Sequence, residues 1–277
     1  MKVWVNGELL DGAAPAVRAD DRGLLVGDGV FETMKVLGGA PFALTRHLDR
    51  LRRSATGMFL AVPADDALRA AVHETLAANA AELPGGDARL RITVTGGPGP
   101  MGSARGDSRP TLIVSTGTLP TYPGPAAVVT VPWPRNDRSA TAAIKTTSFA
   151  DNVIALAYAR DRGGDEAIFA NTLGQLCEGS GTNVFVGIGG ELLTPPLTAG
   201  CLPGVTRALL LEWTAAREVD LPIEALAEAD EAFLASTTRD VHPISHVDGR
   251  AMKGVPGPLT QAAATAFQAA AARNPDP

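Results

Sequence analysis

The sequence predicts a mixed α/β protein built from two domains. The chain has 277 residues, 45% of them hydrophobic and 19% charged, which suffices for a sizeable core in one large domain or two modest ones. Strand-like apolar runs and amphipathic helical segments mix without the regular strand–helix rhythm of a doubly wound parallel sheet. A polar, proline-rich stretch at 118–126 interrupts them. We expect it to link an N-terminal α/β domain, 1–117, to a C-terminal domain, 127–277.

The N-terminal domain is expected to combine short strands with two helices. Asn6-Gly7 between two apolar runs is a strong hairpin signal. Leu44, Leu48 and Leu51 have helical spacing, and an alanine-rich helix should follow them. The expected elements are a hairpin over 3–10, strands joined by close turns within 20–42, helices over 44–60 and 65–81, and strands over 88–97 and 109–117 that flank a glycine-rich substrate-side loop, 96–108.

The C-terminal domain is expected to be richer in strands. Three helices are predicted in it, and the last of them, close to residue 277, is amphipathic. The expected elements are a strand over 126–134, an extended segment leading into a helix over 144–163, strand pairs over 165–179 and 183–195, a helix over 205–217, a strand over 231–238 and a helix over 258–273.

Composition narrows the class of protein. The net charge of −6 and the scattered lysines and arginines argue against nucleic acid or an anionic membrane as a partner. No apolar run approaches the roughly 20 residues that span a bilayer, and the first residues lack a signal-peptide pattern. Cys177 and Cys201 fit buried thiols in a reducing compartment, and Pro243 between His242 and His246 disfavours a helical metal site. We therefore expect a cytoplasmic protein without a metal.

Lys145, in the segment IKTTSF, is a candidate reactive amine. It lies between apolar Ile144 and small polar residues, as a lysine at a strand end would. Partial desolvation there would lower the pKa of Lys145 and make the free amine available for Schiff-base chemistry. The alternative is a surface lysine at a strand edge, which is the commoner case for a single lysine.

Glu178, in the segment QLCEGSGTNVFV, is a candidate acid that pairs with a cation. The glycines beside it allow a close approach of the backbone, and Asn183 could hold the loop. A buried carboxylate needs a cationic partner, which the protonated nitrogen of a pyridine ring would supply. A glutamate on an edge strand beside a β-bulge is the open alternative.

The segment CLPGVTRALLLEW predicts an anion site where a helix begins near Thr206. Free N–H groups and the positive end of the helix dipole attract phosphate, and the Thr206 hydroxyl adds a donor. The alternative is ordinary capping. Ser236-Thr237 could add further donors and Arg50 a full charge, unless Arg50 lies on a solvated helix face.

An amine, an acid and an anion site are together what pyridoxal 5′-phosphate (PLP) requires. The chain resembles the class IV, or fold-type IV, PLP-dependent aminotransferases, which include branched-chain and D-amino acid aminotransferases and aminodeoxychorismate lyases. The resemblance covers nearly the whole chain, through the segments VNGEL, GDGVFETMKV, HLDRL, EGSGTNVFV, TPPLTAGCLPGVTR and STTRDVHPI. It implies a two-domain fold with a smaller N-terminal α/β domain, a larger C-terminal pseudo-barrel domain, and a homodimer.

The resemblance also implies roles for individual residues. Lys145 would bind PLP covalently, and Glu178 would face the pyridine nitrogen. The phosphate would be bound by Arg50, Val205, Thr206 and Thr237, with Ser236 beside them, and the substrate side would be lined by Phe31, Arg91 and Thr238. Arg105 is a further candidate for binding a substrate carboxylate.

The implied activity is transfer of an amino group between an amino acid, or a related amine, and a 2-keto acid, with ping-pong kinetics. A 4-amino-4-deoxychorismate lyase is the second candidate, and a PLP-binding protein without catalysis is the third. The substrate is left open because the glycine-rich loop departs from each relative. Met101 and Ser103 replace the arginine and histidine of D-amino acid aminotransferases, and Arg89 replaces a tyrosine of branched-chain enzymes. Lyases typically carry an arginine where this chain has Gly96.

Overall fold

The computed structural model describes residues 1–107 and 109–277. These residues form two compact units. The first contains Met1–Pro120, Ile144–Phe149 and Pro275–Pro277, and the second contains Thr121–Ala143 and Ala150–Asn274. The six residues around Lys145 thus cluster with the first unit, although they follow the stretch 118–126 in the sequence. The domain boundaries inferred from the sequence remain a prediction.

The first unit is built on a six-stranded antiparallel sheet in the order β2-β1-β6-β5-β3-β4. The predicted hairpin is confirmed, since Val5 pairs with Glu8 and the two turn residues, Asn6 and Gly7, both have positive φ (49° and 103°). The strands are β1 Lys2–Val5, β2 Glu8–Asp11, β3 Gly29–Leu37, β4 Ala40–Pro41, β5 Ala88–Thr95 and β6 Thr111–Gly117.

A short helix, α1 (Arg22–Val26), lies where only strands were predicted, so that part of the prediction is wrong. The Asp21 carboxylate accepts a hydrogen bond from the Gly23 amide at 2.8 Å and caps the helix, and Gly27 ends it in the left-handed conformation (φ 65°). Five residues are too few to show helical periodicity, but the capping aspartate and the closing glycine are both visible in the sequence.

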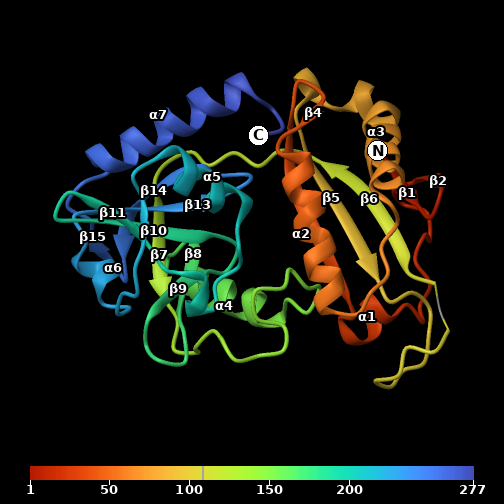
Figure 1. The fold of residues 1–277 in the computed structure, drawn as a ribbon, viewed down its shortest axis with the longest axis horizontal. Coiled ribbons are helices and arrows are strands. Elements are labelled where there is room, and N and C mark those ends of the chain that lie inside the picture. The colour runs from red at the N-terminus through yellow and green to blue at the C-terminus, as the bar shows by residue number, and fades with distance from the viewer. Residues whose placement is uncertain (108) are drawn as a thin grey trace. The chain divides into compact units, whose positions relative to one another are not determined.

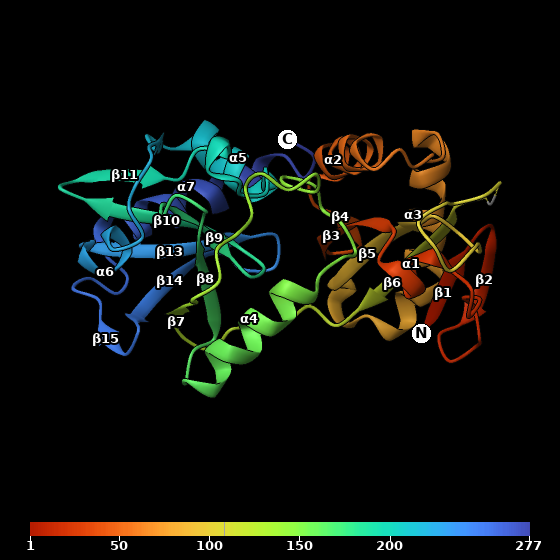
Figure 2. The ribbon, with the colours of Figure 1, turned by 90° about the horizontal axis from the view of Figure 1, so that it is seen from below.

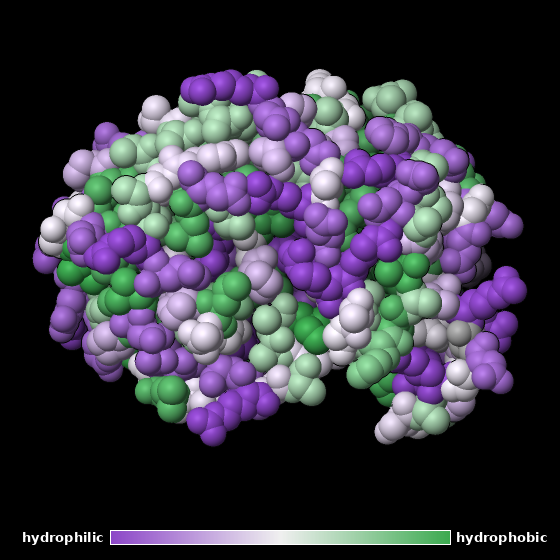
Figure 3. All heavy atoms as spheres, in the orientation of Figure 1, coloured by the Kyte–Doolittle hydropathy of each residue, from purple (hydrophilic) through white to green (hydrophobic). Residues whose placement is uncertain are grey.

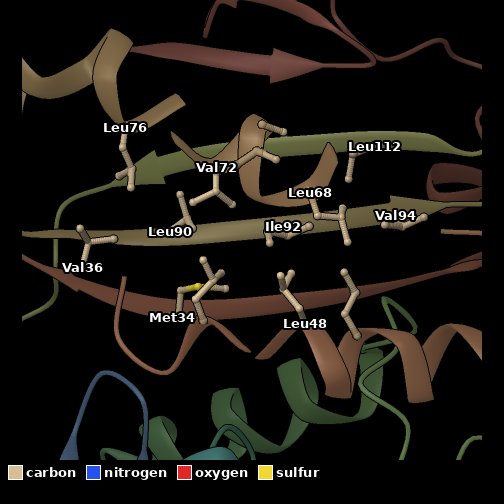
Figure 4. Packing of buried hydrophobic residues seen from close by; sticks show 14 of the residues in the cluster. Met34, Val36, Leu48, Leu68, Val72, Leu76, Leu90, Ile92, Val94 and Leu112 are labelled. Carbon is tan, nitrogen blue, oxygen red and sulfur yellow. The ribbon is translucent and has the colours of Figure 1, made fainter. Parts of the chain in front are cut away.

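Two longer helices cover the sheet of the first unit, α2 (Leu44–Gly57) and α3 (Asp65–Asn79), and both were predicted. Figure 4 shows side chains from these helices pointing toward the strands, with Leu48 near Met34 and Leu68 near Ile92. These side chains are fully buried, and removing such apolar surface from water is the main driving force for packing. Short 3₁₀ turns, Ala80–Glu82 and Pro84–Gly86, connect α3 to β5. Residues 96–107 of the predicted loop, which follow β5, form no helix or strand. The last residue of the predicted loop, Ser108, lies outside the described residues.

The second unit is built on a mixed nine-stranded sheet in the order β12-β11-β10-β13-β14-β7-β8-β9, with β15 beside β14. Strand β9, at one end of this order, also contacts β10, so the sheet curls toward a half-barrel. The strands are β7 Ala126–Thr130, β8 Glu166–Ala170, β9 Leu176–Gly179, β10 Asn183–Ile188, β11 Glu191–Thr194, β12 Arg217–Glu218, β13 Glu231–Ser236, β14 Asp240–Val247 and β15 Arg250–Ala251.

The three helices predicted for the C-terminal region are confirmed. Helix α7 (Pro258–Arg273) packs on β13, β14 and α5 (Val205–Trp213), whereas α4 (Ala150–Asp161) contacts β7 and β8 (Figures 1 and 2). The short elements α6 (Ala225–Glu228) and the 3₁₀ turn Leu197–Ala199 were not predicted. Strand β14 was not predicted either, because Pro243 interrupts its pattern.

The exposed surface mixes residue types. On the face that Figure 3 shows, hydrophilic and hydrophobic residues are interspersed. Within 1–107 and 109–277, the longest apolar helical segments fall short of what a membrane-spanning helix needs.

Candidate active site

Lys145 lies in an extended segment that pairs with the edge of β3. The Phe31 amide donates to the Lys145 carbonyl at 3.0 Å, and the Thr147 amide donates to the Gly29 carbonyl at 2.8 Å. The Lys145 amide in turn donates to the Ser54 hydroxyl on α2 at 3.3 Å. Lys145 is partly buried. Backbone pairing on both sides of Lys145 therefore fixes the point from which its amine extends.

The ring of Phe31 lies against two cationic side chains. The Lys145 Nζ atom is 4.5 Å from the ring centroid, and the Arg91 guanidinium carbon is 3.7 Å from it. Phe149 meets the same ring edge-on, with centroids 5.6 Å apart. The structure thus brings together three predicted residues, the amine of Lys145 and two from the substrate side.

Arg91 is not paired with a carboxylate of any described residue. Its Nε donates to the Thr93 hydroxyl at 3.2 Å, and it forms no ion pair with any residue that the structure describes. Burial, followed by the nearby charge of Arg89, lowers the pKa of Arg91, while Glu32 acts in the opposite direction. A half-buried guanidinium without a carboxylate is well suited to binding an anionic ligand.

Arg50 is buried and bound to Glu32, so the solvated-face alternative for Arg50 does not hold. Its Nε and one terminal nitrogen donate to the two Glu32 oxygens at 2.8 and 2.7 Å, and His47 Nδ1 is 2.7 Å from the same carboxylate. Burial alone would raise the pKa of Glu32, but Arg50 and then His47 outweigh it and lower the pKa to about 2. Glu32 is therefore ionised, and it orients the guanidinium of Arg50.

Glu32 and His47 were not among the site residues predicted from the sequence. The available signal was the spacing of His47 and Arg50, which places both on one face of α2. Burial is the main reason why the pKa of His47 is lowered, and the charges of Arg50 and Lys145 add to this effect. Because Nδ1 faces the ionised Glu32, it carries the hydrogen of the neutral ring. The buried Nε2 has no hydrogen-bond partner among the described residues.

Arg105 is bound by acceptors of the protein itself. Its guanidinium donates to both Asp28 oxygens, at 2.8 and 2.6 Å, and to the carbonyls of Met58 and Phe59. Arg22 donates to Asp28 as well, at 2.9 Å, and to loop carbonyls at Pro100, Gly102, Ser103 and Ala104. In this arrangement Arg105 anchors the glycine-rich loop.

Glu178 lies on β9 and is buried, as predicted. Its Oε1 is 3.1 Å from Arg135 Nε, and its Oε2 accepts a hydrogen bond from the Leu202 amide at 2.8 Å. Arg135 also stacks on Phe169, with its guanidinium carbon 4.2 Å from the ring centroid. The cationic partner expected for this acid was a pyridine nitrogen, and Arg135, which lies far from Glu178 in the sequence, was not predicted. Two contacts therefore fix the orientation of the carboxylate.

The two cysteines near Glu178 are unreactive thiols. Both are free and buried. Burial, and next the charge of Glu178, raises the pKa of Cys201 to about 12, and the same causes raise the pKa of Cys177 further. Neither forms the thiolate that nucleophilic chemistry would need.

The predicted phosphate turn leads into α5, which begins at Val205, where the predicted helix 205–217 begins. Gly204 is required there, because a Cβ atom on it would come within 2.0 Å of Asn183 Oδ1. Asn183 Nδ2 donates to the Leu202 carbonyl at 2.9 Å and holds this turn. Gly204, as the N-cap residue, offers no side-chain cap, so the first N–H groups of α5 and the Thr206 hydroxyl remain the donors of this helix end.

Ser236, Thr237 and Thr238 lie at the turn between β13 and β14 and are partly buried. The Thr238 hydroxyl is 3.1 Å from the Tyr122 hydroxyl. The predicted site residues are therefore divided between the units. The first holds Phe31, Arg50, Arg91, Arg105 and Lys145, and the second holds Glu178, Val205, Thr206, Ser236, Thr237 and Thr238.

The chemistry of these residues fits PLP. A partly buried amine matches its aldehyde, an oriented carboxylate matches its ring nitrogen, and cationic, hydroxyl and N–H donors match its phosphate. The Nε2 atom of His47, buried beside Arg50 without a hydrogen-bond partner among the described residues, is a feature that a bound polar group would explain.

Comparisons with known proteins agree with this fold and chemistry. The family model described as amino-transferase class IV matches residues 29–247. A putative branched-chain-amino-acid aminotransferase of Methanocaldococcus jannaschii is 32% identical, covering 90% of this chain and 89% of that protein. A D-alanine aminotransferase of Bacillus licheniformis is 31% identical, covering 97% and 96%. A hypothetical aminotransferase from Mycobacterium tuberculosis, solved in a PLP-bound form, superposes with a TM-score of 0.87 at 27% identity, covering 98% of both chains.

The fold and these matches define a fold-type IV enzyme of the PLP-dependent type. The chain belongs to the class IV aminotransferases. It is an enzyme that transfers amino groups between amino acids and keto acids.

Proposed function

We propose that the chain uses PLP to move an amino group from an amino acid, or a related amine, to a 2-keto acid in two half-reactions, with Lys145 as the residue that binds the cofactor covalently. The observation that carries this proposal is the position of Lys145. Its backbone is fixed on β3 and on Ser54, and its amine extends over Phe31. Such an arrangement presents one amine at a defined place, as covalent catalysis requires.

PLP, when bound, supplies an aldehyde for the substrate amine and a ring that accepts the electrons of the Cα carbanion. The Lys145 amine would take the proton from the substrate Cα atom and would later give it back. Glu178, oriented by Arg135 and the Leu202 amide, holds a proton at the ring nitrogen.

Anion-binding groups complete the proposed site. Arg50, oriented by Glu32, and the donors at Val205, Thr206, Ser236 and Thr237 bind the phosphate. Phe31, Arg91 and Thr238 bind the substrate, and Arg91 takes its carboxylate because it has no ion pair within the described chain. Arg105 acts on the substrate through the loop that it anchors.

We also propose a homodimer in a reducing compartment, the cytoplasm. The free thiols of Cys177 and Cys201 support the compartment. The exposed apolar side chains of Leu24 and Val26 on α1 support association with a second copy. Sedimentation of the purified chain tests the dimer.

The central test is the substitution Lys145→Ala. The unsubstituted chain should show the visible absorption of lysine-bound PLP and transfer amino groups to a keto acid. Lys145→Ala should lose that absorption and at least about 10³-fold in activity. Lys253→Ala, at an exposed lysine paired with Asp230, is the matched control and should keep both. Retention of the absorption by Lys145→Ala would refute the assignment.

A panel of amines and keto acids then identifies the substrate. An aminotransferase needs a keto-acid acceptor to turn over repeatedly. Formation of pyruvate and 4-aminobenzoate from aminodeoxychorismate without an acceptor would instead establish the lyase.

A further inference from the structure

The turn that carries Thr237 and Thr238 is closed by Arg239. Ser236 pairs with Asp240 across the turn, and the Arg239 amide donates to the Ser236 carbonyl at 3.2 Å. The Arg239 side chain leads away from solvent and is only 10% exposed. A guanidinium buried to this extent requires acceptors, and three groups of the second unit surround it.

One of these groups is the buried carboxylate of Glu166 on β8. Its Oε2 accepts from Arg239 at 3.3 Å. Its Oε1 accepts from the Ser180 hydroxyl and from the Gly181 amide, the latter at 3.2 Å. Ser180 and Gly181 lie in the loop that follows β9, the strand that carries Glu178. A single carboxylate thus connects the Thr237–Thr238 turn with this loop.

The second group is His242 on β14. Arginine can only donate, so His242 Nδ1 is the acceptor of the 2.7 Å bond from Arg239. Nε2 therefore carries the hydrogen and donates to the Gly124 carbonyl at 2.6 Å. Burial is the main reason why the pKa of His242 is lowered, and the charge of Arg239 lowers it further, which agrees with a neutral ring. His242 thus anchors the second arm of the Arg239 guanidinium.

The third group is Tyr122. The Arg239 guanidinium carbon is 4.2 Å from the centroid of its ring, and the Tyr122 hydroxyl is 3.1 Å from the Thr238 hydroxyl. Arg239 therefore supports the ring that holds the side chain of Thr238. The flat, forked guanidinium satisfies all three contacts at once, which an ammonium group could not do.

We propose that Arg239 is a positioning residue, which holds the Thr237–Thr238 turn at a fixed place relative to the Glu178 loop through the buried carboxylate of Glu166. The inference rests on the proposed function, in which Thr237, Thr238 and Glu178 contact cofactor and substrate. Arg239 itself touches neither, because its guanidinium is bound to Glu166, His242 and Tyr122.

The test is a titration of the cofactor-free chain with PLP, followed by visible absorption. Arg239→Met and Glu166→Gln should each raise the dissociation constant about tenfold. The double variant should be little worse than either single one, because both changes break the same contact. Arg273→Met, at an exposed arginine near the end of α7, is the matched control and should bind as the unsubstituted chain does. Unchanged affinity in Arg239→Met, or fully additive effects in the double variant, would overturn the inference.

Two milder variants separate positioning from folding. Arg239→Lys keeps a buried cation near Glu166 but lacks the fork, so its PLP affinity should be intermediate. Tyr122→Phe removes only the hydroxyl group that contacts Thr238, and should raise the KM of the amino donor severalfold while the PLP affinity is kept. An unchanged KM in Tyr122→Phe would contradict the role assigned to this contact. A complete absence of PLP binding by the unsubstituted chain would refute the proposed function instead.

Discussion

Arg135 places its Nε atom 3.1 Å from Oε1 of Glu178, and this ion pair is nearly buried, with side-chain exposures of 17% and 12%. The acid that would hold the proton on the cofactor ring thus has a protein cation beside it. A fixed positive charge stabilises the ionised carboxylate, which can then accept a hydrogen bond from the ring nitrogen. Arg135 should therefore affect both the stability of the fold and the spectrum of the bound cofactor.

Arg135→Met should destabilise the chain by at least about 2 kcal/mol, because it removes the guanidinium beside a buried carboxylate. It should also shift the visible absorption of bound PLP, since Glu178 loses its contact with the Arg135 guanidinium. Urea unfolding and absorption spectra measure these effects. Arg138→Met, at an exposed arginine nearby, should change neither. Equal behaviour of the two variants would show that the ion pair is unimportant.

Glu32 should make stability depend on pH in the acid range. Its pKa in the folded chain is lowered from 4.5 to about 2, so its contribution is complete above 4.5 and is lost as the pH falls toward 2. Glu32→Gln should unfold about 3 kcal/mol more easily at neutral pH, because the buried Arg50 loses the carboxylate that faces it, and should show a flatter pH dependence in that window. Urea unfolding at several pH values measures both. A slope equal to that of the unsubstituted chain would contradict this account.

His47 should make the stability of the fold depend on pH in a second range, at higher pH than Glu32. Its pKa is lowered in the folded chain, so the unfolded chain binds the proton more readily. The stability that depends on neutral His47 is complete above about pH 6.5 and declines as the pH falls below it. The thermal midpoint should therefore drop between about pH 8 and pH 5.5, and His47→Gln should reduce the drop. His73→Gln, at an exposed histidine of α3, serves as the control and should leave the drop intact.

Arg91 and Arg105 should behave differently despite their equal charge. Arg91→Leu should raise the KM of a keto acid about tenfold or more, since a charge-assisted hydrogen bond to its carboxylate is lost. Arg105→Leu should chiefly speed hydrogen exchange in the loop after β5, which Arg105 anchors through Asp28. Arg53→Leu, at an exposed arginine of α2, should do neither. A larger rise in KM for Arg105→Leu would reverse the two assignments.

Much of the fold could be predicted from short-range patterns in the sequence. The turn at Asn6-Gly7, the leucine spacing of α2 and the alanine-rich α3 each depend on residues close in the chain. Strand β14 was not predicted because it contains Pro243. The surrounding sheet accommodates this proline, and local strand propensity does not reveal that. The same limit applies to α1, whose two capping residues were present but whose length gave no periodicity.

The candidate site also contains residues that local sequence predicts and residues that it does not. Lys145, Glu178 and the turn before α5 stand out in the sequence because unusual neighbours surround them. Glu32, which orients Arg50, and Arg135, which orients Glu178, lie on other elements and were not predicted. Glu32 meets Arg50 from a neighbouring strand, and Arg135 meets Glu178 from a distant segment. Contacts of this kind depend on how elements pack, so a single sequence does not disclose them.

Residues 275–277 also belong to the first unit. The Ala43 amide donates to the Pro275 carbonyl at 2.7 Å, Asp276 accepts from the Thr45 amide at 2.8 Å, and Arg46 Nε donates to the Pro277 carbonyl at 2.8 Å. These contacts lie at the first turn of α2, the helix that carries His47 and Arg50. During synthesis on the ribosome, this turn thus stays without its partners until residue 277 has been added. The helix that carries Arg50 is therefore synthesised early, but its first turn gains these contacts only after the whole second unit has been translated.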